Sequence, residues 1–416
     1  MTTSLTRLAS ANTYDTALTN LNNRQSNLSN LQSSLTSGKK ITVASDDPTG
    51  AAQAERALTR ISRIATDQRA LESQRNSITQ AESTLGDVTS ALQNFRDLVV
   101  SAGNGTFSAA ERTTVAVQLT GLRDQILALS NKTDSNGQPL FGALGSAAKP
   151  FTGPQSTTQD YTFQGLPGQT SSSENSIPTT LNGDSAFMLQ ENRDGAYNVS
   201  MSTIPTTRQL QTSTVSANPP GTPVAGASYA ISIDSLDTTT TPGTTTAAYT
   251  VTESPSGTTY AGSGSYATGK PASITVTEMP GLSLTITGAP AVGDTVNVKP
   301  TTSLFSVLDN AIRDIGSAAN ANAATQAVTQ ALGNIDIGMS RVSAVRGQAG
   351  DLLNRADVIT ADNSNKSIQR EADRSRAEDL DMTKGISDFS IAQTGYQAAL
   401  QSYAQIQKLS LFNYIG

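Results

Sequence analysis

Apolar residues recur at helical spacing over more than forty residues between positions 54 and 99. The steps are of three or four residues, about three-quarters of the positions are apolar, and this spacing places the side chains on one face of an α-helix. A stripe of this length predicts a helix packed along its whole length, as in a helical hairpin or a coiled coil. The positions on the stripe are Ala54, Leu58, Ile61, Ala65, Gln68, Leu71, Arg75, Ile78, Glu82, Leu85, Val88, Leu92, Phe95 and Val99.

Each end of the chain carries a further apolar seam of the same kind. Leucines and one tyrosine are spaced seven apart near the N-terminus, interrupted only by Arg24 and Gln25, and aromatic residues recur near the C-terminus. An isolated pair of helices gains too little from burying such side chains to offset the entropy lost on ordering. We therefore predict that the ends pack with each other and with copies of the same chain. The predicted assembly residues are Tyr14, Leu18, Leu21, Leu28, Leu31, Leu35, Phe389, Tyr396, Leu400, Tyr403, Ile406 and Phe412.

Composition excludes most kinds of enzyme. The 416 residues include no Cys and no His, so the chain lacks a thiol nucleophile, an imidazole base and nitrogen or sulfur ligands for zinc. The sequence thus predicts no enzymatic activity, no cofactor and no metal, with an oxygen-ligated metal site or a carboxylate-pair hydrolase as the alternatives. A net charge of −6 without a visible basic cluster argues against nucleic acid or an anionic membrane as a partner. Glu378, Asp379 and Asp381 could bind a cation through oxygen atoms, but a solvated charged turn is the favoured interpretation.

Targeting signals are also absent from the sequence pattern. The first residues, MTTSLTRLASANTYD, lack the apolar core of a secretory signal peptide. No run approaches the roughly 18 apolar residues of a membrane span, so no membrane insertion is expected. Taken alone, these observations predict a cytoplasmic protein.

Capping signals divide the N-terminal region into helices. A helix over residues 5–36 should end before Gly38, and a second should begin with Asp47 as its N-cap and Pro48 in its first position. Glycines at 103 and 105 break that helix. Ser108 and a glutamate three residues later form a capping box, which opens a helix expected to fold back along its predecessor.

The character of the sequence changes between residues 143 and 300, where Thr, Ser, Gly and Pro dominate. Four short runs alternate between apolar and polar residues, at 229–233, 274–276, 282–286 and 296–298. This pattern predicts an antiparallel β-sandwich or small barrel, with a disordered linker as the alternative. The run Gly262-Ser263-Gly264 is interpreted as a turn rather than a phosphate-binding loop, because no helix follows it.

Helical patterning returns at residue 303, and a second long apolar stripe covers 328–356. The pattern fades over 363–371, where we expect a boundary. The predicted class is α+β, a long antiparallel helical or coiled-coil stalk built from both termini with an inserted antiparallel β outer domain. The predicted divisions are 1–45 with 365–416 as the terminal coiled coil, 46–142 with 301–364 as a long-helix bundle, and 143–300 as the β-rich outer domain.

Several segments resemble the bacterial flagellin superfamily. At the N-terminal side these are SLTSGKKITVASDDPTGAA, the stretch containing NGTFSAAER, and TDSNGQPLFGA. At the C-terminal side NIDIGMSRVSAVRGQAGDLLNRAD and SRAEDLDMTKGISDF are similar to the family's conserved end. The closing residues SYAQIQKLSLFNYIG and the β-rich region resemble the family's hook–filament junction proteins more than its flagellins.

This resemblance implies a structural subunit of the flagellum that links hook to filament. It implies export through the flagellar apparatus with an uncleaved signal, so the expected location becomes extracellular. The implied partners are copies of the chain, the preceding hook-associated junction protein, flagellin and, before secretion, an export chaperone. A filament-forming flagellin is the alternative function, followed by an extracellular adhesin or glycan-binding module within the β-rich region.

Overall fold

The computed structural model describes residues 2–155, 160–201 and 208–415, without the side chains of 2–14, 406 and 408–415. The chain divides into two compact units. The terminal unit contains residues 1–69 and 360–416, and the central unit contains residues 70–359. Two long helices, α2 (Pro48–Ala102) and α7 (Ala321–Glu378), contribute to both units.

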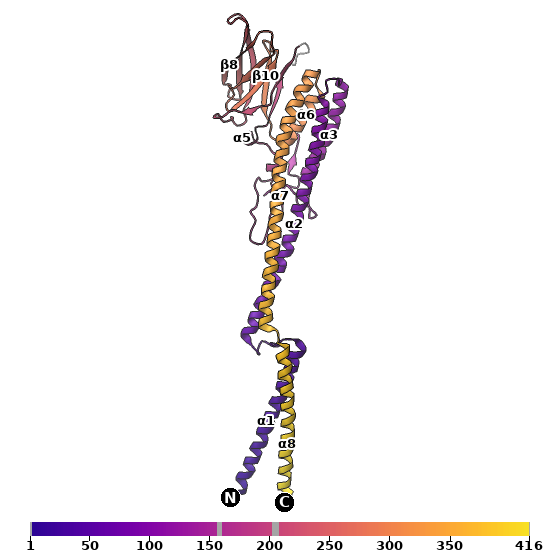
Figure 1. Cartoon of the computed structure of the whole chain (residues 1–416), viewed down its shortest axis with the longest axis vertical. Coiled ribbons are helices and arrows are strands. Elements are labelled where there is room, and N and C mark those ends of the chain that lie inside the picture. The colour runs from indigo at the N-terminus through magenta and orange to yellow at the C-terminus, as the bar shows by residue number, and fades with distance from the viewer. Residues whose placement is uncertain (1, 156–159, 202–207, 416) are drawn as a thin grey trace. The chain divides into compact units, whose positions relative to one another are not determined.

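The terminal unit consists of α1 (Thr2–Ser37), the start of α2, the end of α7 and α8 (Met382–Ile415). Helices α1 and α8 contact each other and run in opposite directions (Figure 1). Helix α1 ends as predicted, because Gly38 adopts a left-handed φ of 72° that favours glycine. The expected boundary at 363–371 does not end α7, which continues to Glu378. The apolar stripe fades there without any glycine or proline to break the helix.

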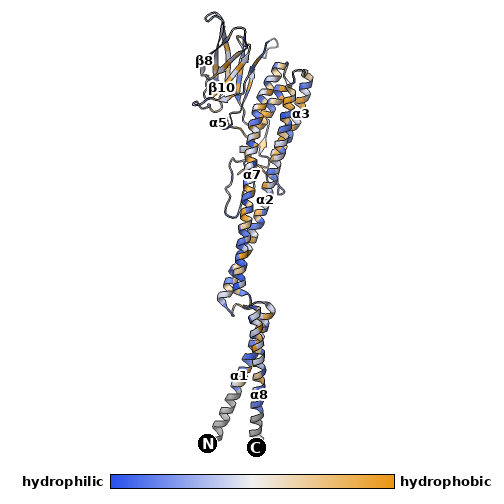
Figure 2. Cartoon of the chain, in the orientation of Figure 1, coloured by the Kyte–Doolittle hydropathy of each residue, from blue (hydrophilic) through white to orange (hydrophobic). Residues whose placement is uncertain are grey.

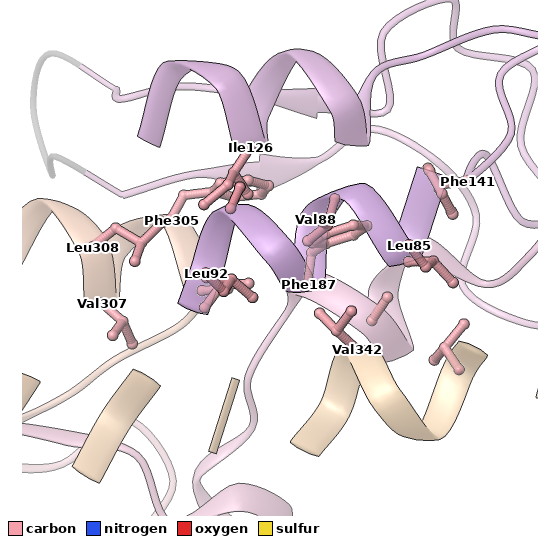
Figure 3. Packing of buried hydrophobic residues seen from close by; sticks show 14 of the residues in the cluster. Leu85, Val88, Leu92, Ile126, Phe141, Phe187, Phe305, Val307, Leu308 and Val342 are labelled. Carbon is pink, nitrogen blue, oxygen red and sulfur yellow. The ribbon is translucent and has the colours of Figure 1, made fainter. Parts of the chain in front are cut away.

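The central unit contains a helical core formed by α2, α3 (Ala109–Ser130), α6 (Leu304–Gly316) and α7. The predicted capping box of α3 is confirmed, since Ser108 and Glu111 exchange both hydrogen bonds. Leu85, Val88 and Leu92 of the α2 stripe are fully buried (Figure 3). Apolar residues are concentrated where α2 and α3 lie in the helical part of the unit (Figure 2).

The segment following α3 packs against this helical core rather than against the sheets. It includes the short elements β1 (Phe151–Thr152), β2 (Thr162–Phe163), α4 (Gly183–Phe187) and α5 (Glu191–Asp194). The rings of Phe151, Phe187 and Phe305 lie within 5.1 to 5.7 Å of one another. Aromatic pairs at such distances add to the stability gained by burial. The region predicted to be β-rich therefore contains two differently packed parts, 143–196 and 197–300.

Residues 197–201 and 208–300 form two antiparallel sheets with a shared apolar core (Figure 1). One sheet has the order β3-β11-β6-β7-β8, and in the other β10 pairs with β4, β5 and β9. All four alternating runs found in the sequence lie in strands. The strands are β3 (Tyr197–Met201), β4 (Leu210–Thr212), β5 (Ser216–Ala217), β6 (Ser228–Asp237), β7 (Thr244–Ser254), β8 (Thr259–Ala267), β9 (Ala272–Val276), β10 (Leu282–Gly288) and β11 (Thr295–Pro300).

The turn predicted at Gly262-Ser263-Gly264 is wrong, because these residues lie inside β8 and pair with β7. A Cβ atom on Gly262 would collide with the ring of Tyr249, and one on Gly264 would lie 2.6 Å from Ile274 Cγ2. The glycines therefore allow close packing over the sandwich core. The predicted fold class, α+β with long terminal helices and an inserted antiparallel β domain, is confirmed.

The chain segments that lead into and out of the β sandwich lie next to each other where the sandwich joins the helical core. The Thr301 N–H donates to the Ala196 carbonyl over 3.0 Å, so the chain enters and leaves the sandwich at one place. Amide side chains on α7 dock the sandwich: Gln326 accepts from Thr212 N–H at 2.8 Å, and Asn334 donates to the Tyr197 carbonyl at 2.9 Å. Both contacts are polar, and Gln326 and Asn334 lie eight residues apart on one face of α7.

Candidate assembly interface

The candidate interface is the pair α1 and α8, which carries every residue predicted for assembly. Seven of these side chains are half-buried within the chain: Leu21, Leu28, Leu31, Leu35, Phe389, Tyr396 and Tyr403. Leu18 and Leu400 remain 49% and 40% exposed. The side chains of Tyr14, Ile406 and Phe412 lie outside the described residues.

Two glycines bring α1 and α8 into close contact. A Cβ on Gly385 would lie 3.1 Å from Leu35 Cδ2, and a Cβ on Gly395 would lie 2.9 Å from Arg24 Nη1. Arg24 interrupts the apolar seam of α1, and it lies where α8 presents no side chain. The glycine thus gives room for a charged residue that would otherwise oppose the packing.

Sequence reasoning missed three exposed apolar residues on α8. Met382, Ile386 and Ile391 are 46%, 58% and 67% exposed. Their apolar character was the available signal: Met382 lies seven residues before Phe389 and continues the main seam, whereas Ile386 and Ile391 lie off its spacing. The exposed apolar surface of α8 is therefore wider than one seam. A single exposed leucine is common on protein surfaces, whereas several on one helix indicate an interaction face.

A charged joint holds the chain together where α1 meets the end of α7. The ammonium group of Lys39 pairs with the Glu378 carboxylate, and the Lys40 N–H donates to the Glu378 carbonyl over 2.8 Å. The Leu380 N–H donates to the Gly38 carbonyl over 2.9 Å. These bonds join segments about 340 residues apart in sequence, as the separation of 339 between Lys39 and Glu378 shows.

Two adjacent aspartates shape the turn that leads into α2. Asp46 accepts from the N–H groups of Thr42 and Val43, each at 3.0 Å. Asp47 accepts from the N–H of Gly50 at 3.0 Å, which confirms it as the N-terminal cap of α2. The Gly50 N–H bond holds the pKa of Asp47 below its ordinary value, and the Val43 N–H bond does the same to the pKa of Asp46.

The acidic residues between α7 and α8 have structural partners. Glu378 accepts from Lys39 and from Arg374, the latter at 3.4 Å. Asp381 accepts from the N–H groups of Thr383 and Lys384, at 3.0 and 3.1 Å, at the start of α8. Within the residues that the structure describes, no group of three or more acidic side chains is arranged to hold a metal ion.

The geometry of the interface supports helix packing and charge pairing rather than bond-making chemistry. None of the helices, over the ranges the structure describes, combines the length and apolar content needed to cross a membrane. Paired terminal helices, a charged joint and an inserted β domain define the chain as a structural protein with long terminal helices.

Comparison with known proteins identifies the family. Residues 9–145 match the bacterial flagellin N-terminal helical region, and residues 332–415 match the bacterial flagellin C-terminal helical region. The two matches together cover more than half of the chain. The protein belongs to the bacterial flagellin family, whose members are structural components of the flagellum, outside the cell. The predicted family is therefore confirmed.

The curated relatives include both hook-associated proteins and flagellins. The chain is 34% identical over 148 residues to flagellar hook-associated protein 3 of Salmonella typhimurium, covering 35% of this chain and 46% of the relative. It is 30% identical over 115 residues to polar flagellin F of Vibrio parahaemolyticus, covering 27% of this chain and 30% of the relative. The chain thus matches less than half the length of these relatives.

Solved structures of hook-associated proteins share the fold. A flagellar hook-associated protein-3 from Legionella pneumophila aligns with a TM-score of 0.59 at 22% identity, covering 76% of this chain and 97% of that one. FlgL from Xanthomonas campestris aligns with a TM-score of 0.58 at 21% identity, covering 77% and 99% of the two chains. These likenesses establish a common fold.

Proposed function

We propose that this protein is the junction subunit that links the flagellar hook to the flagellin filament. Its terminal helices pack with those of neighbouring copies, and the central unit carries the β sandwich. The subunit contacts the preceding hook-associated protein on one side and flagellin on the other. Filament-forming flagellin is the second candidate, because curated flagellins match the same terminal regions.

The observation that carries the proposal is the apolar surface left exposed on paired helices. Leu18 on α1 and Leu400, Ile386 and Ile391 on α8 are between 40% and 67% exposed, although the two helices already contact each other. Exposed apolar surface that follows a helix marks an interaction face. Neighbouring copies that present the same face would cover it.

Two further observations favour a junction subunit over a filament subunit. The curated matches named hook-associated protein 3 extend over 148 and 142 residues, and matches named flagellin extend over 115 to 139 residues. The segment SYAQIQKLSLFNYIG also resembles the hook–filament junction proteins more than the flagellins.

Export follows from the same proposal. The subunit leaves the cell through the flagellar export apparatus without cleavage of a signal peptide, and a chaperone holds it before secretion. A junction subunit must present different partners above and below, so its addition to itself should stop after a ring or a short helical turn.

The test is to add purified protein to isolated hooks that carry the preceding junction protein. The expected result is limited addition, followed by growth of flagellin from the capped end. Cells that lack the protein should keep their hooks and release flagellin monomers into the medium. Long homopolymers of this protein alone, or normal filaments in its absence, would favour the flagellin alternative.

A further inference from the structure

A groove with four arginine residues among the eight that line it lies within the terminal unit, between the start of α2 and the end of α7. Its volume is about 400 Å³. Helix α2 contributes Arg56 and Arg60, and helix α7 contributes Arg370, Asp373 and Arg376. Arg56 and Arg60 are one helical turn apart, so both guanidinium groups project from one face of α2. We call this feature the arginine groove.

The arginine groove carries more positive charge than its own residues neutralise. Asp373 pairs with Arg370 at 3.1 Å and with Arg376 at 2.7 Å, so a single carboxylate serves two guanidinium groups. No hydrogen bond or ion pair of Arg56 or Arg60 occurs within the described part of the chain. Four guanidinium groups thus face one carboxylate, and Arg376 is still 76% exposed.

The rest of the chain has the opposite charge balance. The terminal unit holds 14 basic and 12 acidic residues, a net charge of +2, whereas the central unit holds 14 basic and 22 acidic residues, a net charge of −8. The positive terminal unit of one subunit is therefore complementary in charge to the negative central unit of a second subunit. Such complementarity directs association and fixes which surfaces meet.

We propose that the arginine groove binds carboxylate side chains on the central unit of a neighbouring copy. This inference rests on the proposed function, because it requires copies of the chain to assemble side by side. The contact joins different surfaces of the two copies, which is the geometry that builds a ring or a helical turn. Guanidinium groups suit the task because their planar donors bind carboxylates through two parallel hydrogen bonds.

The arginine groove and the apolar seam of α1 and α8 have different roles in assembly. Apolar packing between helices contributes affinity but tolerates sliding along the seam, whereas paired charges fix the position of one copy relative to the next. Arg370 and Arg376 are already held by Asp373, so little rotamer freedom remains to be lost when a second carboxylate binds.

The test compares two charge reversals on α2 in the full-length protein. Arg56→Glu with Arg60→Glu places acidic groups in the groove, whereas Arg63→Glu with Arg69→Glu makes the same charge change outside its lining. Circular dichroism should show that both variants keep wild-type helicity. Addition to hooks should fall at least about tenfold for the groove variant and stay near the wild-type level for the control.

A photo-crosslinking residue at Gln53, which also lines the groove, identifies the occupant. Crosslinks within assembled protein should join position 53 to peptides from residues 70–359 of another copy. Reversing the crosslinked acidic residue to arginine should then restore addition of the groove variant. Crosslinks only to flagellin or to the terminal unit of a copy would overturn the inference, as would wild-type addition of the groove variant.

These outcomes separate the two proposals. If wild-type protein fails to add to hooks at all, the proposed function is wrong and the contact between copies falls with it. If wild-type protein adds to hooks and the groove variant adds equally well, the proposed function stands and only the role of the groove is wrong.

Discussion

Truncating two exposed leucines of the terminal helices should weaken assembly without affecting the fold of the monomer. Leu18→Ala with Leu400→Ala removes apolar side chains that are 49% and 40% exposed in the single chain. Substitutions at such exposed positions change the free energy of unfolding by less than about 0.5 kcal/mol. A loss of assembly affinity is expected only if a neighbouring copy covers these side chains.

The size of the effect follows from the exposed fractions. Complete burial of a leucine side chain stabilises by about 1.5–3 kcal/mol. The exposed fractions of Leu18 and Leu400 thus leave roughly 1 kcal/mol each to be gained on assembly. The double variant should lose about 2 kcal/mol per subunit, which corresponds to a roughly 30-fold lower affinity for the growing junction.

The assay measures addition to isolated hooks as a function of protein concentration. The midpoint concentration should rise by about 30-fold for the double variant. A matched control is Leu144→Ala with Leu166→Ala, which makes the same chemical change at side chains 46% and 58% exposed in the central unit. The control should assemble like the wild type.

Three results would refute this reasoning. A double variant that assembles at the wild-type concentration would show that α1 and α8 are not covered by neighbouring copies at these positions. A clear fall in the thermal midpoint of the monomer would show that Leu18 and Leu400 stabilise the isolated chain instead. Equal losses in the test and control variants would point to a general effect of surface apolar area.

Two further predictions concern the central unit. Phe187→Ala, at a fully buried side chain packed against Phe151 and Phe305, should lower the free energy of unfolding by about 3–5 kcal/mol in denaturant titrations followed by circular dichroism. Val117→Ala, at a side chain 69% exposed on α3, is its control, and a similar small change in both would contradict the aromatic core. Replacing residues 197–300 with a short glycine linker should leave the helical core folded and addition to hooks intact, because the Thr301 N–H already bonds to the Ala196 carbonyl. Loss of helicity in that deletion protein would show that the helices depend on the sandwich.

Much of the local structure can be predicted from the sequence. Helix ends follow from groups that act within a few residues, such as Gly38 after α1, Asp47 before α2 and the capping box at Ser108. The four alternating runs of the β region are strands for the same reason, since alternation reports burial of one face. The repeated seams and family motifs at both ends also predict the α+β class and the flagellin family.

Local patterns do not reveal how distant segments pair. The sequence places Gly262 and Gly264 in a turn, but in the tertiary structure Tyr249 and Ile274 occupy the space that their side chains would fill. Isolated aromatics such as Phe151 and Phe187, set among Thr, Ser and Gly, show no periodicity, yet they complete the helical core. Their burial depends on α6, more than 100 residues further along the chain.

By itself, the sequence determined the long helices, their caps, the strand runs and the apolar seams, because each depends on residues within one or two helical turns. Only the tertiary structure decided the sheet order, the joint between Lys39 and Glu378, and the arginine groove. The four groove arginines are dispersed along two helices that are some 300 residues apart, so no basic cluster is visible in the sequence. Folding brings them together because α2 and α7 pack in opposite directions, and the resulting local charge depends on that packing.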